Sequence, residues 1–392
     1  FLVGNVGRPG GVLLNPASPL RGVPATAPAT PFADWKKLAD RLRSGQPRPV
    51  NLLLAHGANP VYGLPAEIGF PEALGRVPYI VSFSSFMDET TAQADLVLPA
   101  HTYLESWGGD IPEPGPGYQV VGLQQPAVNA VHNTRSFGDA LLTIAEELGT
   151  DMARALPWRN VRDMLRESVQ GLRELRRGSV SGADLEEFWG RALQQGGWWD
   201  LATRGPVPRG GTAPALPPRA ALPRYAGEAR EYPFHLILFP SLSLTDGRGA
   251  HLPWLQALPD PISTVVWRTW VEINAREAQR LGLAEGDIVV VEAPNGRTIE
   301  APVYPHPALP PDVIGMPAGQ GHSTYGRYAE NRGANPLSIV AALTDEESGG
   351  LAWAATRVRL RKPGQRIRIP KFEGTVPSIQ LPGAPIVQVT KG

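Results

Sequence analysis

Continuous hydrophobic runs alternate with segments of helical periodicity over the first hundred residues. The run 49–55 carries no charge and ends in the loop sequence His56-Gly57-Ala58-Asn59-Pro60, as a buried parallel strand would. Strands that alternate with helices predict a doubly wound α/β domain with a parallel sheet. Further strands are predicted at 79–83 and 95–99, and helices at 35–44, 65–75 and 88–94.

Helical periodicity continues in the segments 137–148, 158–175 and 185–195, the last of which stops at Gly196-Gly197. Residues 203–231 then carry clustered proline, glycine and arginine and are predicted to form a linker. The predicted order is therefore a Gly/Pro-rich arm (1–34), an α/β domain with a helical insertion (35–202), the linker (203–231) and a second domain (232–392).

The second domain has a β pattern. Short runs rich in Val, Ile and Thr predict strands, and Pro294-Asn295-Gly296 carries an Asn-Gly hairpin signal. One small helix is predicted at 275–281, capped by Asn274 and stopped by Gly282. Many short strands with frequent turns indicate a closed barrel. The predicted strands are 234–239, 271–274, 287–293, 297–303 and 313–316, and the basic tail 357–371 is predicted to be an exposed edge strand rather than a site for an acidic partner.

Composition excludes several classes of function. The 392 residues include 37 basic and 37 acidic ones, so no global charge favours nucleic acid. No hydrophobic run approaches the ~20 residues of a membrane helix. Cysteine is absent, which excludes disulfides, thiolate metal sites and cysteine-held iron-sulfur clusters on this chain. The seven histidines are scattered, and we expect no metal site. The first residue is Phe, and we expect a piece of a longer or processed protein.

The stretch 316–328 is the strongest candidate for a binding loop. It combines three glycines with an amide, an imidazole, two phenols and a guanidinium, and Asn335-Pro336 follows shortly after. For His322, a hydrogen bond to the backbone is an equal alternative to ligand contact. For Asn59-Pro60, a plain loop is the alternative to a ligand contact at a strand end.

Other polar or aromatic pairs have a structural explanation as well as a functional one. His101 and Glu105 have the spacing of an acid-base pair, but structural packing is favoured for them. The pair Trp198-Trp199 fits an interface anchor and burial within the domain equally well.

Several motifs together resemble the carboxyl-terminal half of the large subunits of the molybdopterin oxidoreductases, the dimethyl sulfoxide reductase superfamily. Their order and spacing match that family over nearly the whole chain. The motifs are Gly4 to Gly11, Gly57-Ala58-Asn59-Pro60, Glu89 to Ala100, Tyr103 to Gly108, Val271 to Asn274, Leu281-Gly282-Leu283 with Gly286-Asp287, and Gly319-Gln320-Gly321-His322.

The resemblance implies an α/β domain followed by a double-psi β-barrel, with a groove that holds the guanine dinucleotide arms of a pterin cofactor. A Gly-rich turn after a parallel strand suits a pyrophosphate, and Asp or Asn side chains can pair with a guanine edge. The cofactor-contact candidates that it implies are Asn59, Ser84, Asp88, Glu105, Gln320, His322, Tyr325 and Asn335.

The family's amino-terminal part, with its iron-sulfur domain and molybdenum ligand, has no counterpart in these residues. The stretches 319–328, 335–337 and 385–390 look most like the large iron-sulfur subunit of alternative complex III. That branch implies a non-catalytic scaffold in a quinol-oxidising respiratory complex, without a metal or catalytic residue of its own. The groove would hold molybdopterin guanine dinucleotide or be an empty remnant.

The same resemblance implies partners and a location. Iron-sulfur clusters are expected on an adjoining domain or subunit, cytochrome c and other subunits as partners, and the extracytoplasmic (periplasmic) side of the membrane as the location. The alternative is the cofactor-binding part of an active molybdenum enzyme that acts on a small oxoanion or sulfur compound. A third reading is a stand-alone nucleotide-binding or assembly protein.

Overall fold

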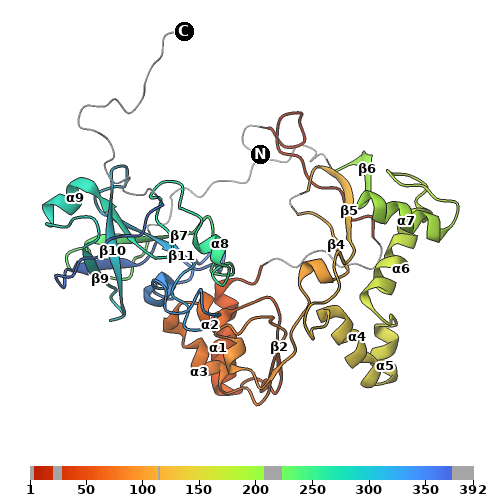
Figure 1. Cartoon of the computed structure of the whole chain (residues 1–392), viewed down its shortest axis with the longest axis horizontal. Helices are drawn as coiled ribbons and strands as arrows, with labels where there is room; N and C mark the ends of the chain where they lie inside the picture. The colour runs from red at the N-terminus through yellow and green to blue at the C-terminus, as the bar shows by residue number, and fades with distance from the viewer. Residues whose placement is uncertain (1–3, 21–28, 114, 207–222, 373–392) are drawn as a thin grey trace, which may run out of the picture. The chain divides into compact units, whose positions relative to one another are not determined.

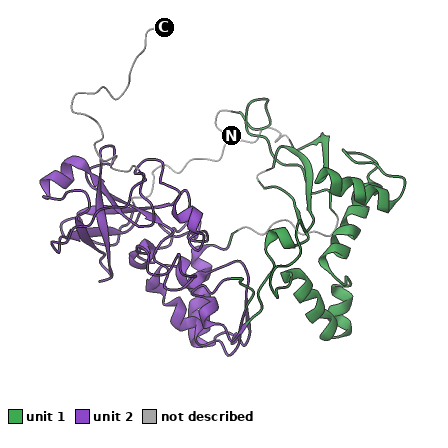
Figure 2. Ribbon diagram, viewed as in Figure 1, with its two compact units in different colours: residues 1–29, 82–85, 97–221 green, residues 30–81, 86–96, 222–392 purple. Residues whose placement is uncertain are grey.

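The computed structural model describes residues 4–20, 29–113, 115–206 and 223–372 (Figure 1). Contacts divide the chain into two compact units that alternate along the sequence (Figure 2). Unit 1 comprises residues 1–29, 82–85 and 97–221, and unit 2 comprises 30–81, 86–96 and 222–392. Most of the predicted α/β strands thus group with the barrel. The predicted domain boundaries stay a prediction, and much of the linker 203–231 lies outside the described residues.

A small sheet and its helices form most of the first part of unit 2, and the sheet's residues Ser82 and Val97 are assigned to unit 1. The strands β1 (Leu53–Ala55), β2 (Ile80–Ser82) and β3 (Leu96–Val97) lie in the order β1-β2-β3. Backbone bonds from Asp95 N–H to Ile80 O and from Leu98 N–H to Ser82 O advance in the same direction along both strands, as in a parallel sheet. The alternation of strands and helices that the sequence predicted is confirmed.

Helices α1 (Phe32–Ser44) and α3 (Phe70–Leu74) bury their apolar faces in one core with Ile80 of β2. Trp35 and Phe70 meet edge to face with ring centroids 5.7 Å apart. Gly45, with φ 68°, ends α1, since this left-handed conformation suits glycine. The short elements nearby are α2 (Pro60–Gly63), η1 (Ala66–Ile68) and η2 (Thr91–Gln93).

The second part of unit 2 is a closed barrel in the order β10-β8-β11-β7-β12-β9, and β9 pairs again with β10. The pairs β8/β10 and β7/β11 are parallel and the others antiparallel. Leu236, Ile273, Ile314 and Met316 are among the fully buried side chains that fill it. The predicted barrel is confirmed. Its strands are β7 (Phe234–Pro240), β8 (Val271–Asn274), β9 (Ile288–Glu292), β10 (Thr298–His306), β11 (Val313–Ala318) and β12 (Arg357–Arg361).

Local signals in the barrel are also confirmed. Asn274 accepts backbone N–H groups of α9 (Ala275–Arg280), and Gly282, with φ 66°, follows the helix. The Asn295-Gly296 turn joins the antiparallel strands β9 and β10. The remaining helices of this part are α8 (Pro253–Gln256) and η4 (Pro336–Ile339).

The prediction of an exposed edge strand within 357–371 is wrong. Strand β12 pairs with β7 on one side and with β9 on the other, and thereby closes the barrel. Its Arg359 and Arg361 bond to Glu292, and Lys362 bonds to Asp287. The alternating charges therefore belong to a barrel strand whose Arg359 and Arg361 already have an acidic partner.

Unit 1 combines a three-stranded antiparallel sheet in the order β4-β5-β6 with four helices among its described residues. Trp198 is fully buried in its core and donates to Arg177 O at 3.1 Å, which favours the burial reading of that tryptophan. The elements are β4 (Gly108–Asp110), β5 (Tyr118–Gln124), β6 (Gly197–Arg204), η3 (Tyr103–Glu105), α4 (Phe137–Glu147), α5 (Thr150–Ala155), α6 (Val161–Glu174) and α7 (Leu185–Gln195).

The sequence did not predict this antiparallel sheet. Strand β4 consists of two glycines and an aspartate, and β6 starts at Gly197 just after the end of α7, so neither was recognised as a strand. Within the described parts of the chain, no helix combines the length and hydropathy that crossing a membrane requires.

Candidate functional site

Three loops of unit 2 that lie far apart in the sequence meet at one place. They are the loop after β1 with Asn59, the loop after β2 with Asp88 and Glu89, and the loop after β11 that includes the predicted binding stretch 316–328. The first two follow the carboxyl ends of parallel strands, where ligands bind in α/β sheets. Six of the eight predicted contact residues belong to this cluster.

Glu89 is the centre of the cluster. Its carboxylate is buried and accepts hydrogen bonds from Asn59 Nδ2 at 2.7 Å and from the backbone N–H of Ser323 at 2.8 Å. His322 Nδ1 lies 3.1 Å from both of its carboxylate oxygens. Burial acts to raise the pKa of Glu89, but the hydrogen bonds from His322 and Asn59 outweigh it and lower that pKa to about 2. A buried carboxylate thus ties the barrel loop to the two sheet loops.

His322 is itself fully engaged. Only 3% of it is exposed, its Nε2 lies 3.2 Å from Gly247 O, and its ring stacks on Tyr62 with centroids 3.8 Å apart. Both ring nitrogens face oxygen acceptors, so both bonds form together only when the ring carries two protons. The Tyr62 hydroxyl donates to Gln320 O at 2.9 Å, and burial, with the Glu89 charge, raises the pKa of that hydroxyl.

The amide side chains of the cluster are also bonded within the protein. Gln320 is buried and pairs with Gln256 through Nε2 to Oε1 at 2.6 Å. Asn335 donates to Tyr62 O at 2.9 Å and accepts from the backbone N–H of Leu337. Asn59 uses its carbonyl oxygen for the hydroxyl of Thr90 at 2.8 Å.

Glycine allows the backbones to approach at two positions. Gly321 has φ +85°, and a β-carbon there would collide with the backbone of Ala334 and Asn335. Gly247 has φ +103°, and a β-carbon there would meet Tyr62 at 2.7 Å and His322 at 2.8 Å. Two of the loop glycines in this region therefore serve close packing of the protein on itself.

Tyr325 lies at the more open side of the cluster. Its backbone is strained at φ +93°, and its hydroxyl donates to Arg248 O at 3.0 Å. Burial raises its pKa to about 12, with contributions from the charges of Asp88 and Asp246. The ring packs against His251, with centroids 4.6 Å apart. Asp88, which is buried, accepts the backbone N–H of Thr91 at 2.7 Å.

Ser84 and Glu105 belong to unit 1 and are described apart from this cluster. Glu105 completes a capping box with Thr102 and accepts the backbone N–H of Val131 at 2.9 Å, and these bonds lower its pKa. His101 bonds instead to Thr134 at 2.7 Å. The favoured packing reading of His101 and Glu105 agrees with these bonds. The prediction that all eight residues contact a cofactor stays a prediction.

Sequence reasoning missed three members of the cluster. Glu89 opens one of the family-like motifs, and its place beside Asp88 after a predicted strand was an available signal. Tyr62 follows Asn59-Pro60 by two residues, but nothing in the sequence relates it to His322. Gln256 carries no sequence signal at all, since it becomes important only through its bonds to Gln320 and to Ala250 O.

The cluster does not fit a dinucleotide in the form that the structure shows. The buried groups of His322, Gln320 and Glu89 would have to break protein bonds before they could reach a ligand, at a cost of about 1 to 3 kcal/mol for each group left unpaired. Two nearby atoms, His251 Nδ1 and Thr324 Oγ1, are buried but have no hydrogen-bond partner, unlike the groups above. Within the described ranges, no group of three His, Asp or Glu side chains could hold a metal ion.

Comparison with known proteins relates this fold to one superfamily. Residues 260–354 match the model of the molydopterin dinucleotide binding domain. The chain is 29% identical over 380 residues to the menaquinone reductase molybdopterin-binding-like subunit of Nitratidesulfovibrio vulgaris, covering 92% of this chain and 49% of that protein. It is 22% identical to the molybdopterin-containing subunit of the arsenate respiratory reductase of a Shewanella species, covering 83% and 46%.

Among solved structures, acetylene hydratase from Pelobacter acetylenicus shares the fold with a TM-score of 0.62 at 17% identity, covering 83% of this chain and 46% of that one. Together these matches support a chain of the molybdopterin oxidoreductase superfamily. It spans about half the length of the curated relatives that it matches.

Proposed function

We propose that this chain is a non-catalytic, molybdopterin-oxidoreductase-like part of a membrane-associated, quinol-oxidising electron-transfer complex of the alternative complex III type. The observation that carries the proposal is the closed network around Glu89 and His322. A cofactor cradle needs polar groups that are free to turn toward the ligand. Here the polar side chains of the family-like loop form hydrogen bonds within the protein, which suits a scaffold.

The comparisons support the quinone-linked part of the proposal. The relative from Nitratidesulfovibrio vulgaris is named as a menaquinone reductase subunit that is molybdopterin-binding-like. We therefore assign to the assembly, not to this chain, the oxidation of a quinol and the transfer of its electrons. Iron-sulfur clusters would lie on an adjoining domain or subunit, with cytochrome c subunits among the partners. The assembly would face the periplasm.

Growth in molybdate-depleted, tungstate-supplemented medium tests this function. Tungstate prevents the loading of molybdenum enzymes, so it separates a scaffold from a catalyst. We expect the quinol-oxidising activity per purified assembly to stay unchanged, while a molybdenum enzyme from the same cells loses its activity as the internal control. A parallel loss of quinol oxidation would contradict the proposal.

The alternative is that these residues are the cofactor-binding part of an active molybdenum enzyme. Two observations favour it: the match of residues 260–354 to the dinucleotide-binding model, and the unpartnered atoms His251 Nδ1 and Thr324 Oγ1 beside Tyr325. In that case the arsenate in the name of the Shewanella relative suggests a small oxoanion as the substrate class. The tungstate experiment decides between the two, because the assembly would lose its activity only under this alternative.

A further inference from the structure

Unit 1 contains a large open groove that the proposed function does not use. Its volume is about 1630 Å³, and it lies between the arm 15–20, the strands β4 and β5, and helix α6. Small-molecule sites usually enclose about 300 to 1,000 Å³. The groove therefore exceeds what an ordinary ligand fills.

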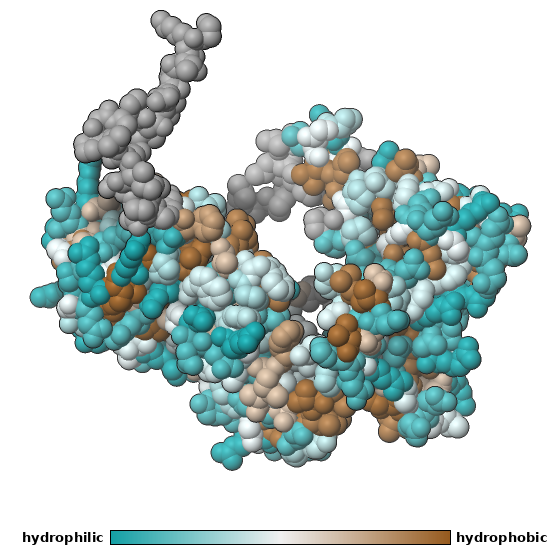
Figure 3. All heavy atoms as spheres, in the orientation of Figure 1, coloured by the Kyte–Doolittle hydropathy of each residue, from teal (hydrophilic) through white to brown (hydrophobic). Residues whose placement is uncertain are grey.

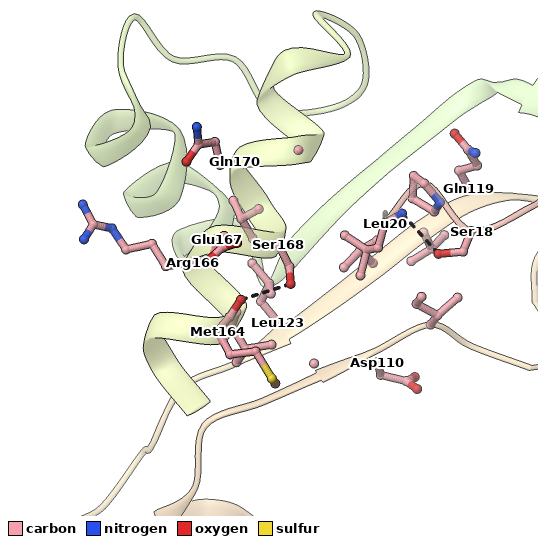
Figure 4. Close-up of a pocket in the computed structure, with 18 of the residues that line it drawn as sticks. Ser18, Leu20, Asp110, Gln119, Leu123, Met164, Arg166, Glu167, Ser168 and Gln170 are labelled. Carbon is pink, nitrogen blue, oxygen red and sulfur yellow. Dashed lines mark hydrogen bonds between the residues drawn. The ribbon is translucent and has the colours of Figure 1, made fainter. Parts of the chain in front are cut away.

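The groove opens onto the hydrophobic core of unit 1. Leu20, Ile111, Leu123 and Leu165 line it and also pack against the buried cluster around Trp198. Figure 4 shows Leu20 on one side of the space and Leu123 with Met164 on the other. Both walls of the groove therefore present hydrophobic side chains. Sheets and helices normally bury such faces against another element, so an additional layer of structure is expected to cover the groove.

The charges along the groove exclude an anionic ligand. Seven charged residues line it, the acidic Asp110, Glu113, Asp163, Glu167 and Glu174 and the basic Arg159 and Arg166. Arg159 already pairs with Asp163 at 3.1 Å, and the guanidinium of Arg166 pairs with Glu186 and points away from Leu20 (Figure 4). A pyrophosphate would meet a net negative wall, so the groove does not suit a dinucleotide.

The polar groups inside the groove do not call for a polar ligand either. Ser168 Oγ donates to Met164 O at 3.0 Å, and Gln119 donates to Ala17 O at 2.8 Å while accepting from Arg177. Strand β4 pairs with β5 alone among the described strands, so its other edge offers backbone groups to a further segment.

The surface of unit 1 is apolar elsewhere too. Tyr103, Val131 and Leu148 are 74%, 74% and 68% exposed. Figure 3 shows hydrophobic residues, in brown, at several places on the visible face of this unit. Single hydrophobic residues at a protein surface are common, so docking is inferred from the groove itself and not from these side chains.

We propose that the groove is the docking site of the polypeptide corresponding to the part of the relatives that this chain does not match. The matched relatives are about twice as long as this chain, since it spans 49% and 46% of their length. A missing apolar layer, an open strand edge and a mildly acidic rim fit an apolar segment with basic flanks. The inference concerns assembly of the fold and does not depend on whether molybdenum is bound.

A single thiol tests the proposal, because the chain has no cysteine of its own. Ser168→Cys places a thiol in the groove, and Ser181→Cys places one at an exposed position outside it. We expect Cys-directed maleimide to label both variants in the isolated full chain. In the native assembly the label at 168 should fall at least tenfold while the label at 181 does not change.

A short photo-activated cross-linker on the same thiol identifies the occupant. A cross-linked peptide that aligns with the unmatched part of the relatives supports the proposal. Equal labelling of 168 in the assembly overturns it, as does a cross-link to a second copy of this chain or to an unrelated subunit. Protection that is lost on removal of small molecules also overturns it. None of these readouts depends on metal content. Failure of the docking proposal can therefore be distinguished from failure of the proposed function.

A second pair of variants tests the energetics. Met164→Arg puts a charge against the groove, and Met152→Arg puts one on helix α5 at an exposed residue that does not line it. We expect Met164→Arg to lower recovery of the chain in the purified assembly at least tenfold and Met152→Arg to leave it unchanged, with circular dichroism confirming that both variants fold. Equal recovery of the two folded variants contradicts the proposal.

Discussion

Glu89 and His322 show how one buried pair can join segments more than 200 residues apart. The carboxylate accepts hydrogen bonds from an amide and from backbone N–H groups, and it faces the imidazole. Burying a charge is costly unless it is paired and hydrogen-bonded, and these partners offset that cost. The two residues thus join the loop after β11 to the loop after β2.

His322→Ala should destabilise the chain by about 2 to 4 kcal/mol, because it removes the stack on Tyr62 and leaves the buried Glu89 carboxylate with fewer partners. Urea unfolding followed by tryptophan fluorescence measures this loss. His132→Ala is the matched control. His132 is exposed in unit 1, so its replacement should change stability by less than about 0.5 kcal/mol. Equal effects of the two substitutions would show that the network does not stabilise the fold.

The pH dependence of stability should also reveal Glu89. Its pKa is lower in the folded chain, at about 2, than in the unfolded chain, so the folded state releases its proton more readily. Its contribution is therefore full above the unfolded pKa and is lost as the pH falls from about 5 toward 2. We expect the stability difference between the natural chain and Glu89→Gln to shrink over this range in urea titrations. A difference that is constant with pH would contradict the assigned role.

Among the structural elements, the loop after β11 depends on a close approach between its backbone at Gly321 and the backbone of Asn335. Gly321→Ala should cost more than about 2 kcal/mol, since its φ is positive and the new β-carbon would meet the backbone of Asn335. Gly326→Ala is the control, because Gly326 has almost the same φ of +84° but open space around it, and it should cost only about 1 to 2 kcal/mol. Thermal unfolding of both variants compares them, and identical losses would mean that the close approach is unimportant.

Strand β12 offers a test of barrel closure. Val358 is fully buried between β7 and β9, so Val358→Ala should destabilise the chain by about 1.5 to 3 kcal/mol. Arg361→Ala, on the same strand, removes an exposed ion pair with Glu292 and should cost less than about 1 kcal/mol. Chemical unfolding distinguishes the two. If Arg361→Ala cost as much as Val358→Ala, the charges and not the core would hold this strand.

These elements also show which features of the fold could be predicted from the sequence. Hydrophobic periodicity and turn residues are local, so the barrel strands, the Asn295-Gly296 turn and the capped helix α9 could be predicted from them. Pairing partners are not local. The two-sided pairing of β12 could not be seen in its alternating charges, and strand β4 has too few hydrophobic residues to look like a strand. The same limit hid Gln256, whose partner Gln320 is 64 residues away.

For the chain as a whole, the family that the fold indicates and the activity that we propose are different. The fold, the dinucleotide-domain match and the similarity to curated relatives support an origin in a superfamily of cofactor enzymes. The loops that should hold the cofactor are instead bonded to one another. The proposed scaffold role would reconcile the two, because a subunit without the pterin could keep the fold while internal bonds took the place of ligand contacts.

Molybdenum content tests this account most directly. The purified native assembly would be analysed for molybdenum and tungsten by mass spectrometry and for extractable pterin by fluorescence, each referred to the amount of this chain. We expect far less than one metal atom per chain, whether molybdenum or tungsten, and far less than one pterin per chain. Quinol oxidation should remain intact. One molybdenum atom per chain together with stoichiometric pterin would contradict it.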